Sequence, residues 1–176
     1  MIVAVTGTPG TGKSSVAAAL AEELDHKLVD VNEVAKSGTV ETERDERRDA
    51  DAVDIPSLVE ALQQRVPDDA VLDGHLSHHF PADLTVVLRC SPDELEERLA
   101  GKGWDEEKIV ENVQAESMDV ILQEAVAERD EVIEIDTTAR KADDVAKELA
   151  AIIEDGSYDD HRPGQVDWQV AMPDPA

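Results

Sequence analysis

The stretch GTPGTGKSS, residues Gly7 to Ser15, follows four apolar residues, Ile2–Val5, almost at the start of the chain. It matches the pattern G-x-x-x-x-G-K-[ST], in which glycines let successive backbone N–H groups turn inward around a phosphate group. The positive end of the following helix points at the same place. Because Ile2–Val5 predicts a buried strand and Ser14–Leu24 a helix, we expect a phosphate-binding loop here and not a simple turn.

Four residues are expected to carry the chemistry around this loop. Lys13 is placed to reach the β- and γ-phosphates of a nucleotide, and the Ser14 hydroxyl to ligate Mg²⁺. Asp73 ends a predicted strand, where an aspartate of such a fold holds the Mg²⁺ shell, usually through water. His75 follows two residues later and is expected near the γ-phosphate, although a lone histidine is more often structural than catalytic.

A zinc site is not predicted from the sequence. His75, His78, His79 and Cys90 have no spacing typical of zinc ligands, and carboxylates near a nucleotide prefer Mg²⁺. Cys90 is the only cysteine, which excludes an internal disulfide.

The charge of the chain is unusual. It has 42 acidic and 16 basic residues among 176, for a formal net charge of -26, and the acidic residues are spread along its length. We interpret this as the surface of a halophilic protein, which strongly hydrated carboxylates keep soluble where salt screens their repulsion. The alternative is an ordinary acidic protein.

The same composition limits the partners and the location. The chain has no basic patch that could replace counterions on a phosphate backbone, so we expect no direct binding of nucleic acid. No apolar run approaches the roughly 18 residues of a membrane span. The chain opens on a predicted strand and not on a secretion signal, so we expect a cytoplasmic protein.

Short apolar runs alternate with helical patterns along the chain. The predicted strands are Ile2–Val5, Lys27–Val31, Ala70–Asp73, Leu84–Leu88 and Val132–Ile135. The predicted helices are Ser14–Leu24, Pro56–Val66, Pro92–Ala100, a long one over Glu106–Arg129, and Ala142–Ile153. This alternation predicts an α/β fold with a five-stranded parallel sheet covered by helices on both faces. From Gly156 onward we expect a mobile or surface-draped tail, with Trp168 as its anchor.

Four segments together resemble one family. The phosphate loop GTPGTGKSS, DGHLSHHFP (73–81), LRCSPDELEERL (88–99) and KGWDEEKIVENVQAE (102–116) are similar to the adenylate kinase isoenzyme 6 family, the coilin-interacting nuclear ATPase type, which has archaeal members. The resemblance spans residues 2–155 and implies a P-loop NTPase domain of the nucleoside monophosphate kinase type with a short lid. It also implies a broad nucleoside monophosphate kinase that hydrolyses ATP, acts in late maturation of the small ribosomal subunit (16S rRNA), and contacts a basic ribosomal protein of the subunit platform. A halophilic archaeal source agrees with the acidic composition.

The resemblance also implies roles for particular residues. It places Gly10, Gly12, Lys13, Ser14 and Ser15 at the ATP phosphates, and it makes Asp73 the Mg²⁺ aspartate and His75 the catalytic histidine. It assigns Gly101–Glu111 to the lid and Leu28–Asp51 to the monophosphate-binding segment. The chain has Lys102 and Lys36 where the family usually has arginines, and lysine offers a point charge in place of a bidentate fork. Both substitutions therefore predict weaker clamping of the phosphoryl groups.

Several cations have two interpretations. Lys102, flanked by Gly101 and Gly103, is either a hinged cation that closes on the phosphates, together with Arg98, or part of an ordinary turn between helices. Arg44, Arg47 and Arg48 either clamp an acceptor phosphate or lie on a solvated helix. Arg89, at the end of a predicted strand beside the phosphate loop, is a further candidate cation. The loop Thr138–Lys141, which contains Arg140, is expected to contact the nucleotide base.

Three functions remain open on the sequence. The first is transfer of the γ-phosphoryl group of ATP to AMP or another nucleoside monophosphate. The second is a ribosome assembly ATPase with negligible kinase activity. The third is a kinase acting on a small non-nucleotide acceptor. A GTPase is disfavoured because the chain has no N-K-x-D motif.

Overall fold

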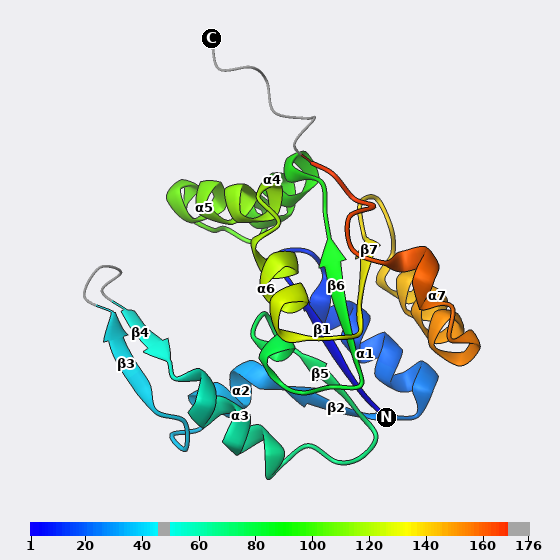
Figure 1. The fold of residues 1–176 in the computed structure, drawn as a ribbon. Helices are drawn as coiled ribbons and strands as arrows, with labels where there is room; N and C mark the ends of the chain where they lie inside the picture. The colour runs from blue at the N-terminus through cyan, green and yellow to red at the C-terminus, as the bar shows by residue number, and fades with distance from the viewer. Residues whose placement is uncertain (46–49, 169–176) are drawn as a thin grey trace.

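The fold is built on five parallel strands in the order β2-β5-β1-β6-β7 (Figure 1). A computed structural model describes residues 1–45 and 50–168. The strands are β1 (Ile2–Gly7), β2 (Lys27–Asp30), β5 (Ala70–Asp73), β6 (Leu84–Arg89) and β7 (Val132–Asp136). Each strand is paired in parallel with its neighbours, so all five carboxyl ends lie at one edge of the sheet. The predicted α/β class and five-stranded parallel sheet are confirmed.

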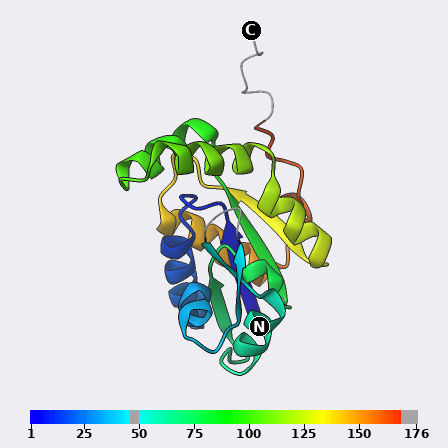
Figure 2. The same ribbon diagram turned by 90° about the vertical axis from the view of Figure 1, so that its left-hand side faces the viewer.

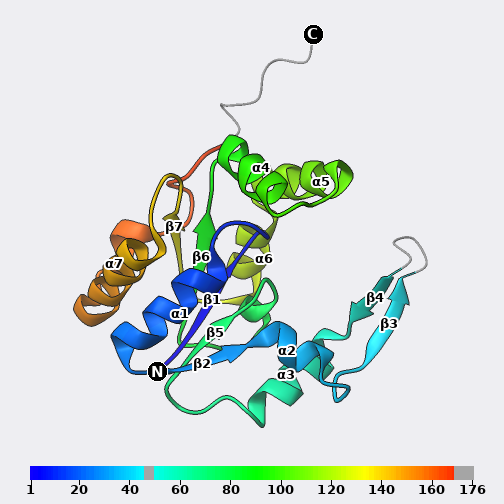
Figure 3. The same ribbon diagram turned by 180° about the vertical axis from the view of Figure 1, so that it is seen from behind.

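Helices cover both faces of this sheet. Helices α1 (Lys13–Leu24) and α7 (Ala142–Asp155) pack on one face, against Val3 and Val5 of β1 and their neighbours (Figure 3). The other face carries α2 (Val31–Lys36), α3 (Ile55–Gln63) and α6 (Val120–Glu128). Successive side chains of a strand point to opposite faces, so a sheet buried on both sides needs almost continuous apolar strands. The six residues of β6 are all buried, as this requires.

Two pieces lie outside these layers. Helices α4 (Pro92–Gly101) and α5 (Glu106–Ser117) lie beyond the carboxyl edge of the sheet (Figures 1 and 2). Strands β3 (Thr42–Asp45) and β4 (Ala50–Val53) form an antiparallel hairpin that extends away from the sheet (Figure 1). Neither α2 nor this hairpin was predicted. Arg44 lies on β3, so the solvated helix proposed for the arginine-rich stretch is wrong there, and Arg47 and Arg48 lie outside the described residues.

The predicted long helix Glu106–Arg129 is wrong, because the chain breaks into α5 and α6. Asp119 lies between them in the left-handed backbone region, with φ of 56°. Aspartate tolerates this conformation better than most residues, and its side chain bonds to Arg89. The break lets α5 cross the edge of the sheet while α6 packs on its face.

The described part of the tail lies against the surface of the domain. After α7 a short 3₁₀ helix, η2 (Tyr158–His161), is followed by a segment that runs beside β7. The Glu134 Oε1 atom accepts three backbone N–H groups, from Gly164, Gln165 and Val166, at 2.5 to 2.9 Å. Trp168 donates its indole N–H to Glu116 at 3.3 Å. Among the helices of residues 1–45 and 50–168, none is long and apolar enough to cross a membrane.

Candidate functional site

The loop between β1 and α1 is closed by its own backbone. Thr8 O accepts hydrogen bonds from the backbone N–H and the hydroxyl of Thr11, at 3.2 and 2.8 Å. Gly10 and Gly12 have φ values of 96° and 94°, which favour glycine. A side chain at Gly10 would also lie within 3 Å of Leu95 and Leu99 of α4, so this helix packs directly on the loop. The loop therefore has the strand, helix and glycine geometry expected of a phosphate cradle.

Lys13 points into this cradle. Its Nζ atom donates to Thr8 O at 3.0 Å. Burial lowers the pKa of the Lys13 ammonium to about 8, against the opposing attraction of Asp73, and nearby Lys102 lowers it further. A partly dehydrated ammonium gains most from an anion that arrives beside it, since the charge has little water to lose.

Asp73 and Ser14 meet at the carboxyl end of β5. Burial raises the pKa of the Asp73 carboxyl, and a hydrogen bond from Ser14 opposes this shift only in part. Asp30, opposite Asp73 in the β2–β5 pair, adds to the upward shift. Among the described residues, the buried Asp73 Oδ1 atom has no hydrogen-bond partner. A hydroxyl beside a carboxylate oxygen with unused capacity is a donor set that fits Mg²⁺.

The histidines after β5 have different surroundings. Burial, followed by the charges of Lys13 and His79, lowers the pKa of His75, which keeps its imidazole neutral at pH 7. His78 is completely buried, and burial lowers its pKa to about 4. His79 bonds through Nδ1 to Glu128 at 2.9 Å. His75 is the one of the three that lines a cavity of the site.

Two cavities adjoin the loop. The first, of about 330 Å³, lies on the side of α7 and is lined by Gly10, Gly12, Ser15, Arg98, Lys102 and Arg140, among others. The second, of about 480 Å³, lies between α2, the β3–β4 hairpin and His75, and its lining includes Asn32, Lys36, Val40 and Leu76. The structure therefore brings Lys102, Arg140 and the loop glycines to one cavity, and Lys36 and His75 to the other.

Arg98 and Arg140 are held in place by several contacts. Arg98 donates to Gly10 O at 3.4 Å and to Thr137 O at 2.9 Å, and it pairs with Glu94. Arg98 thus joins the loop to the segment after β7. Arg140 donates to Asp136 O at 3.1 Å and pairs with Glu148 of α7. Lys102 is exposed at the end of α4.

Arg89 is not a free cation of the site, contrary to its interpretation from the sequence. It is 1% exposed and ion-paired with three carboxylates: Glu116 and Glu134, at 2.8 and 2.9 Å, and Asp119. Its place at the end of a predicted strand beside the phosphate loop suggested a ligand role, but carboxylates from α5, the α5–α6 break and β7 surround it. Every guanidinium nitrogen donates to a protein oxygen, and the three carboxylates already balance its single positive charge.

Two residues that the sequence did not single out, Glu116 and Thr137, support the loop. Glu116 accepts the Thr8 hydroxyl at 2.6 Å through Oε2, and Arg89 and Trp168 through Oε1. Thr137 donates to Thr11 O at 2.9 Å. These contacts join residues 108 and 126 positions apart, so no local pattern could have indicated them.

Comparisons with known proteins agree with this geometry. Residues 3–119 match a family model described as "AAA domain". The chain is 42% identical over 177 residues to "Putative adenylate kinase" of Archaeoglobus fulgidus, covering 99% of this chain and 95% of the relative. Proteins of the same name are 44% identical in Pyrococcus furiosus, covering 96% and 91%, and 45% identical in Natronomonas pharaonis, covering 88% and 90%.

Solved structures with little sequence identity share the fold. Shikimate kinase from Acinetobacter baumannii has a TM-score of 0.57 at 18% identity and covers 88% of this chain and 93% of its own. Thymidylate kinase from Candida albicans has a TM-score of 0.56 at 18% identity, covering 89% and 92%. At this identity the likeness concerns the fold alone, and it agrees with the P-loop kinase architecture.

The buried charge cluster generates a prediction about stability. Replacing Arg89 with Met leaves Glu116, Glu134 and Asp119 without their shared cation. We expect the free energy of unfolding to fall by about 3–5 kcal/mol, because an uncompensated buried charge is costly. Denaturant unfolding at fixed salt concentration measures it. Arg162→Met is the matched control, since its ion pairs are exposed and its loss should change little. Equal stability of Arg89→Met and the parent protein would contradict the account.

Proposed function

The chain belongs to the archaeal adenylate kinase family, and we propose that it is a nucleoside monophosphate kinase that also hydrolyses ATP. The proposed reaction transfers the γ-phosphoryl group of ATP to AMP or another nucleoside monophosphate. The observation that carries this proposal is the pair of cavities beside the phosphate loop. One adjoins the loop glycines, as a donor site must, and the other adjoins His75, as an acceptor site would.

On the donor side, the chain offers cations to the phosphates. We propose that the loop from Gly7 to Ser15 binds the phosphates of ATP, with Lys13 beside the β- and γ-phosphates and Lys102 closing from α4. Arg140 is proposed to contact the base. Positioned cations stabilise the charge that spreads over the transferring group and its leaving oxygen. Lys102 acts as a point charge, which positions a phosphate less strictly than an arginine fork.

Ser14 and Asp73 are the residues that would hold Mg²⁺. When bound, this ion neutralises negative charge on the phosphate oxygens. The unshared Asp73 oxygen and the Ser14 hydroxyl support this assignment.

On the acceptor side, the residues 28–51 are proposed to bind the monophosphate, with Lys36 near its phosphate. An oxygen of that phosphate forms a bond to the γ-phosphorus while the bond from the γ-phosphorus to the leaving oxygen of ADP breaks. This nucleophile is already an anion at pH 7, so no base has to remove a proton from it. Hydrolysis differs, because the attacking water must lose a proton, and a neutral imidazole such as His75 can accept one.

We further propose a role in late maturation of the small ribosomal subunit. The resemblance to the coilin-interacting nuclear ATPase type supports it, and so does a net charge of -26, which favours basic proteins and disfavours nucleic acid. The proposed partner is a basic ribosomal protein of the subunit platform. ATP turnover would then also serve release of the protein from its complex.

An acceptor scan with labelled ATP tests the kinase proposal. With Mg²⁺ in ~2 M KCl, we expect a labelled nucleoside diphosphate from AMP and from at least one other nucleoside monophosphate. Lys13→Met should abolish both transfer and hydrolysis, since it removes the cation inside the cradle. Hydrolysis without any transfer would favour the assembly ATPase, and labelling only of a non-nucleotide acceptor would favour a small-molecule kinase.

Substitution of His75 separates hydrolysis from transfer. In His75→Ala we expect ATP hydrolysis to fall about 100-fold, at the lower end of what a lost general base costs. Transfer to AMP and the Kd for ATP should change only a few fold, because neither needs proton removal. His161→Ala is the control, because His161 lies on η2 and lines neither of the two cavities. Equal losses of hydrolysis and transfer would show that His75 acts by positioning.

Calorimetry tests the partner. In ~2 M KCl the Debye length is about 3 Å or less, so long-range attraction is screened. The purified platform protein should still bind under these conditions, and its affinity should differ with and without Mg·ATP. Fragments of 16S rRNA should not bind. Binding to the RNA alone, or an affinity for the partner that Mg·ATP does not change, would contradict the proposal.

A further inference from the structure

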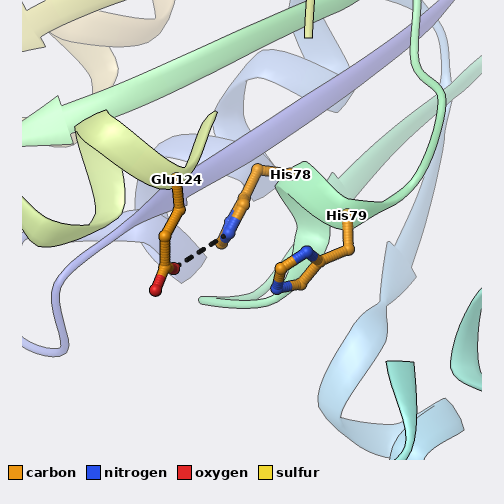
Figure 4. Close-up of side chains that lie close together, drawn as sticks. All are labelled: His78, His79 and Glu124. Atoms are coloured by element: carbon orange, nitrogen blue, oxygen red, sulfur yellow. Dashed lines mark ion pairs between the residues drawn. The ribbon is translucent and has the colours of Figure 1, made fainter. Parts of the chain in front are cut away.

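Three side chains on the α6 face of the sheet are arranged as ligands of a metal ion. His78 and His79 lie on the 3₁₀ helix η1 (Ser77–His79), and Glu124 faces them from α6 (Figure 4). One ligand atom from each lies within 4.8 Å of the others. Within the described part of the chain, none of the three lines either nucleotide cavity. This cluster, formed by His78, His79 and Glu124, is therefore separate from the proposed catalytic site.

Hydrogen bonds fix the tautomer of His78. The Thr6 hydroxyl lies 3.2 Å from His75 O and 3.0 Å from His78 Nδ1. A hydroxyl has one proton, and the carbonyl oxygen can only accept, so Nδ1 must carry the proton that it shares with Thr6. The lone pair of a neutral His78 is then on Nε2. This buried atom has no hydrogen-bond partner in residues 1–45 and 50–168, and it lies 3.3 Å from an oxygen of Glu124.

His79 is prepared in the same way. Its Nδ1 lies 2.9 Å from both oxygens of Glu128, and an ionised carboxylate can only accept hydrogen bonds. Nδ1 is therefore the protonated nitrogen, and Nε2 is left as an electron-pair donor. Metal-binding histidines characteristically donate their other ring N–H to a carboxylate or another oxygen, which sets the tautomer and the orientation of the ring.

We propose that Nε2 of His78, Nε2 of His79 and the Glu124 carboxylate bind a divalent transition-metal ion of the Zn²⁺ class. A tetrahedral ion with bonds of ~2.0–2.1 Å separates its ligand atoms by roughly 3.3–3.4 Å. The distance from His78 Nε2 to Glu124 matches this. Two lone pairs of electrons facing each other at 3.3 Å repel, and a cation between them turns that repulsion into two bonds.

The ligand types favour zinc over the magnesium of the nucleotide site. Imidazole nitrogen suits Zn²⁺ and related ions, whereas Mg²⁺ takes oxygen ligands. Glu124 is 47% exposed, which gives the ion a path from solvent and leaves a fourth position for water. The bound ion joins η1 to α6, so it fixes the end of the segment that carries His75. This inference does not depend on the proposed kinase activity.

Zinc titration of the full chain tests the site. The metal-stripped, nucleotide-free protein is titrated with Zn²⁺ at pH 7.5. Its many other carboxylates can also bind zinc weakly, so the parent protein is compared with variants. Glu124→Gln, which removes a ligand, should weaken the tightest site at least about 100-fold. Glu128→Gln, which alters only the support of His79, should weaken it about 10-fold. Glu97→Gln removes the same charge from an exposed position on α4 and should bind zinc like the parent.

Thermal melting gives a second readout that needs no activity. At a free Zn²⁺ concentration 100 times its Kd, the Tm of the parent protein and of Glu97→Gln should rise by about 5–10 °C, and that of Glu124→Gln should not. Zinc binding that is equal in the parent and Glu124→Gln, or a parent protein without a site tighter than ~10 µM, would overturn the proposal.

Discussion

The rest of the site depends on one buried cation, the guanidinium of Arg89. It carries a single positive charge and is paired with three carboxylates, from α5, from the α5–α6 break and from β7. The surplus negative charge is shared with N–H and O–H donors. Glu134 accepts the backbone of residues 164–166, and Glu116 accepts Cys90 N–H, the Thr8 hydroxyl and the Trp168 indole. A buried cluster of this kind is tolerable only when nearly every donor and acceptor is used.

This cluster joins segments that hydrophobic packing alone would leave independent. The apolar clusters on the two faces of the sheet do not include α4 and α5, which have a small one of their own around Leu95, Leu99 and Ile109. Glu116 ties the end of α5 to the phosphate loop through Thr8, and to β6 through Arg89. The same oxygen that binds Arg89 also binds the tail. Glu116 and Glu134 are among the few acidic residues that are buried in the described part of the chain, and they connect these segments.

Much of the fold was predictable because its signals are local. The apolar runs of β1, β5, β6 and β7 and the glycine spacing of the phosphate loop can be read within a few residues. The hairpin β3–β4 was not, because its charged residues show no alternation of apolar and polar positions. The break at Asp119 was missed because the partner of its side chain, Arg89, lies 30 residues away. For the same reason the sequence made Arg89 a ligand candidate, and the histidine spacing alone gave no sign of the metal site that we propose. The ligand that completes the His78–His79 pair, Glu124, comes from α6, which is distant in the chain.

The contacts of Glu116 also determine which end of α5 is constrained. At its C-terminal end, Glu116 and Ser117 are buried, and Thr8 and Arg89 hold Glu116 from two directions. At the other end, Gly101 and Gly103 flank the exposed Lys102, and a Cβ atom added to either glycine would meet no other atom within 4 Å. Gly103 also has a φ of 75°, which other residues rarely adopt. The backbone therefore has its steric freedom on the side that carries Lys102. Rotation there can move the Lys102 ammonium relative to the donor cavity without breaking the bond between Thr8 and Glu116 that supports the phosphate loop.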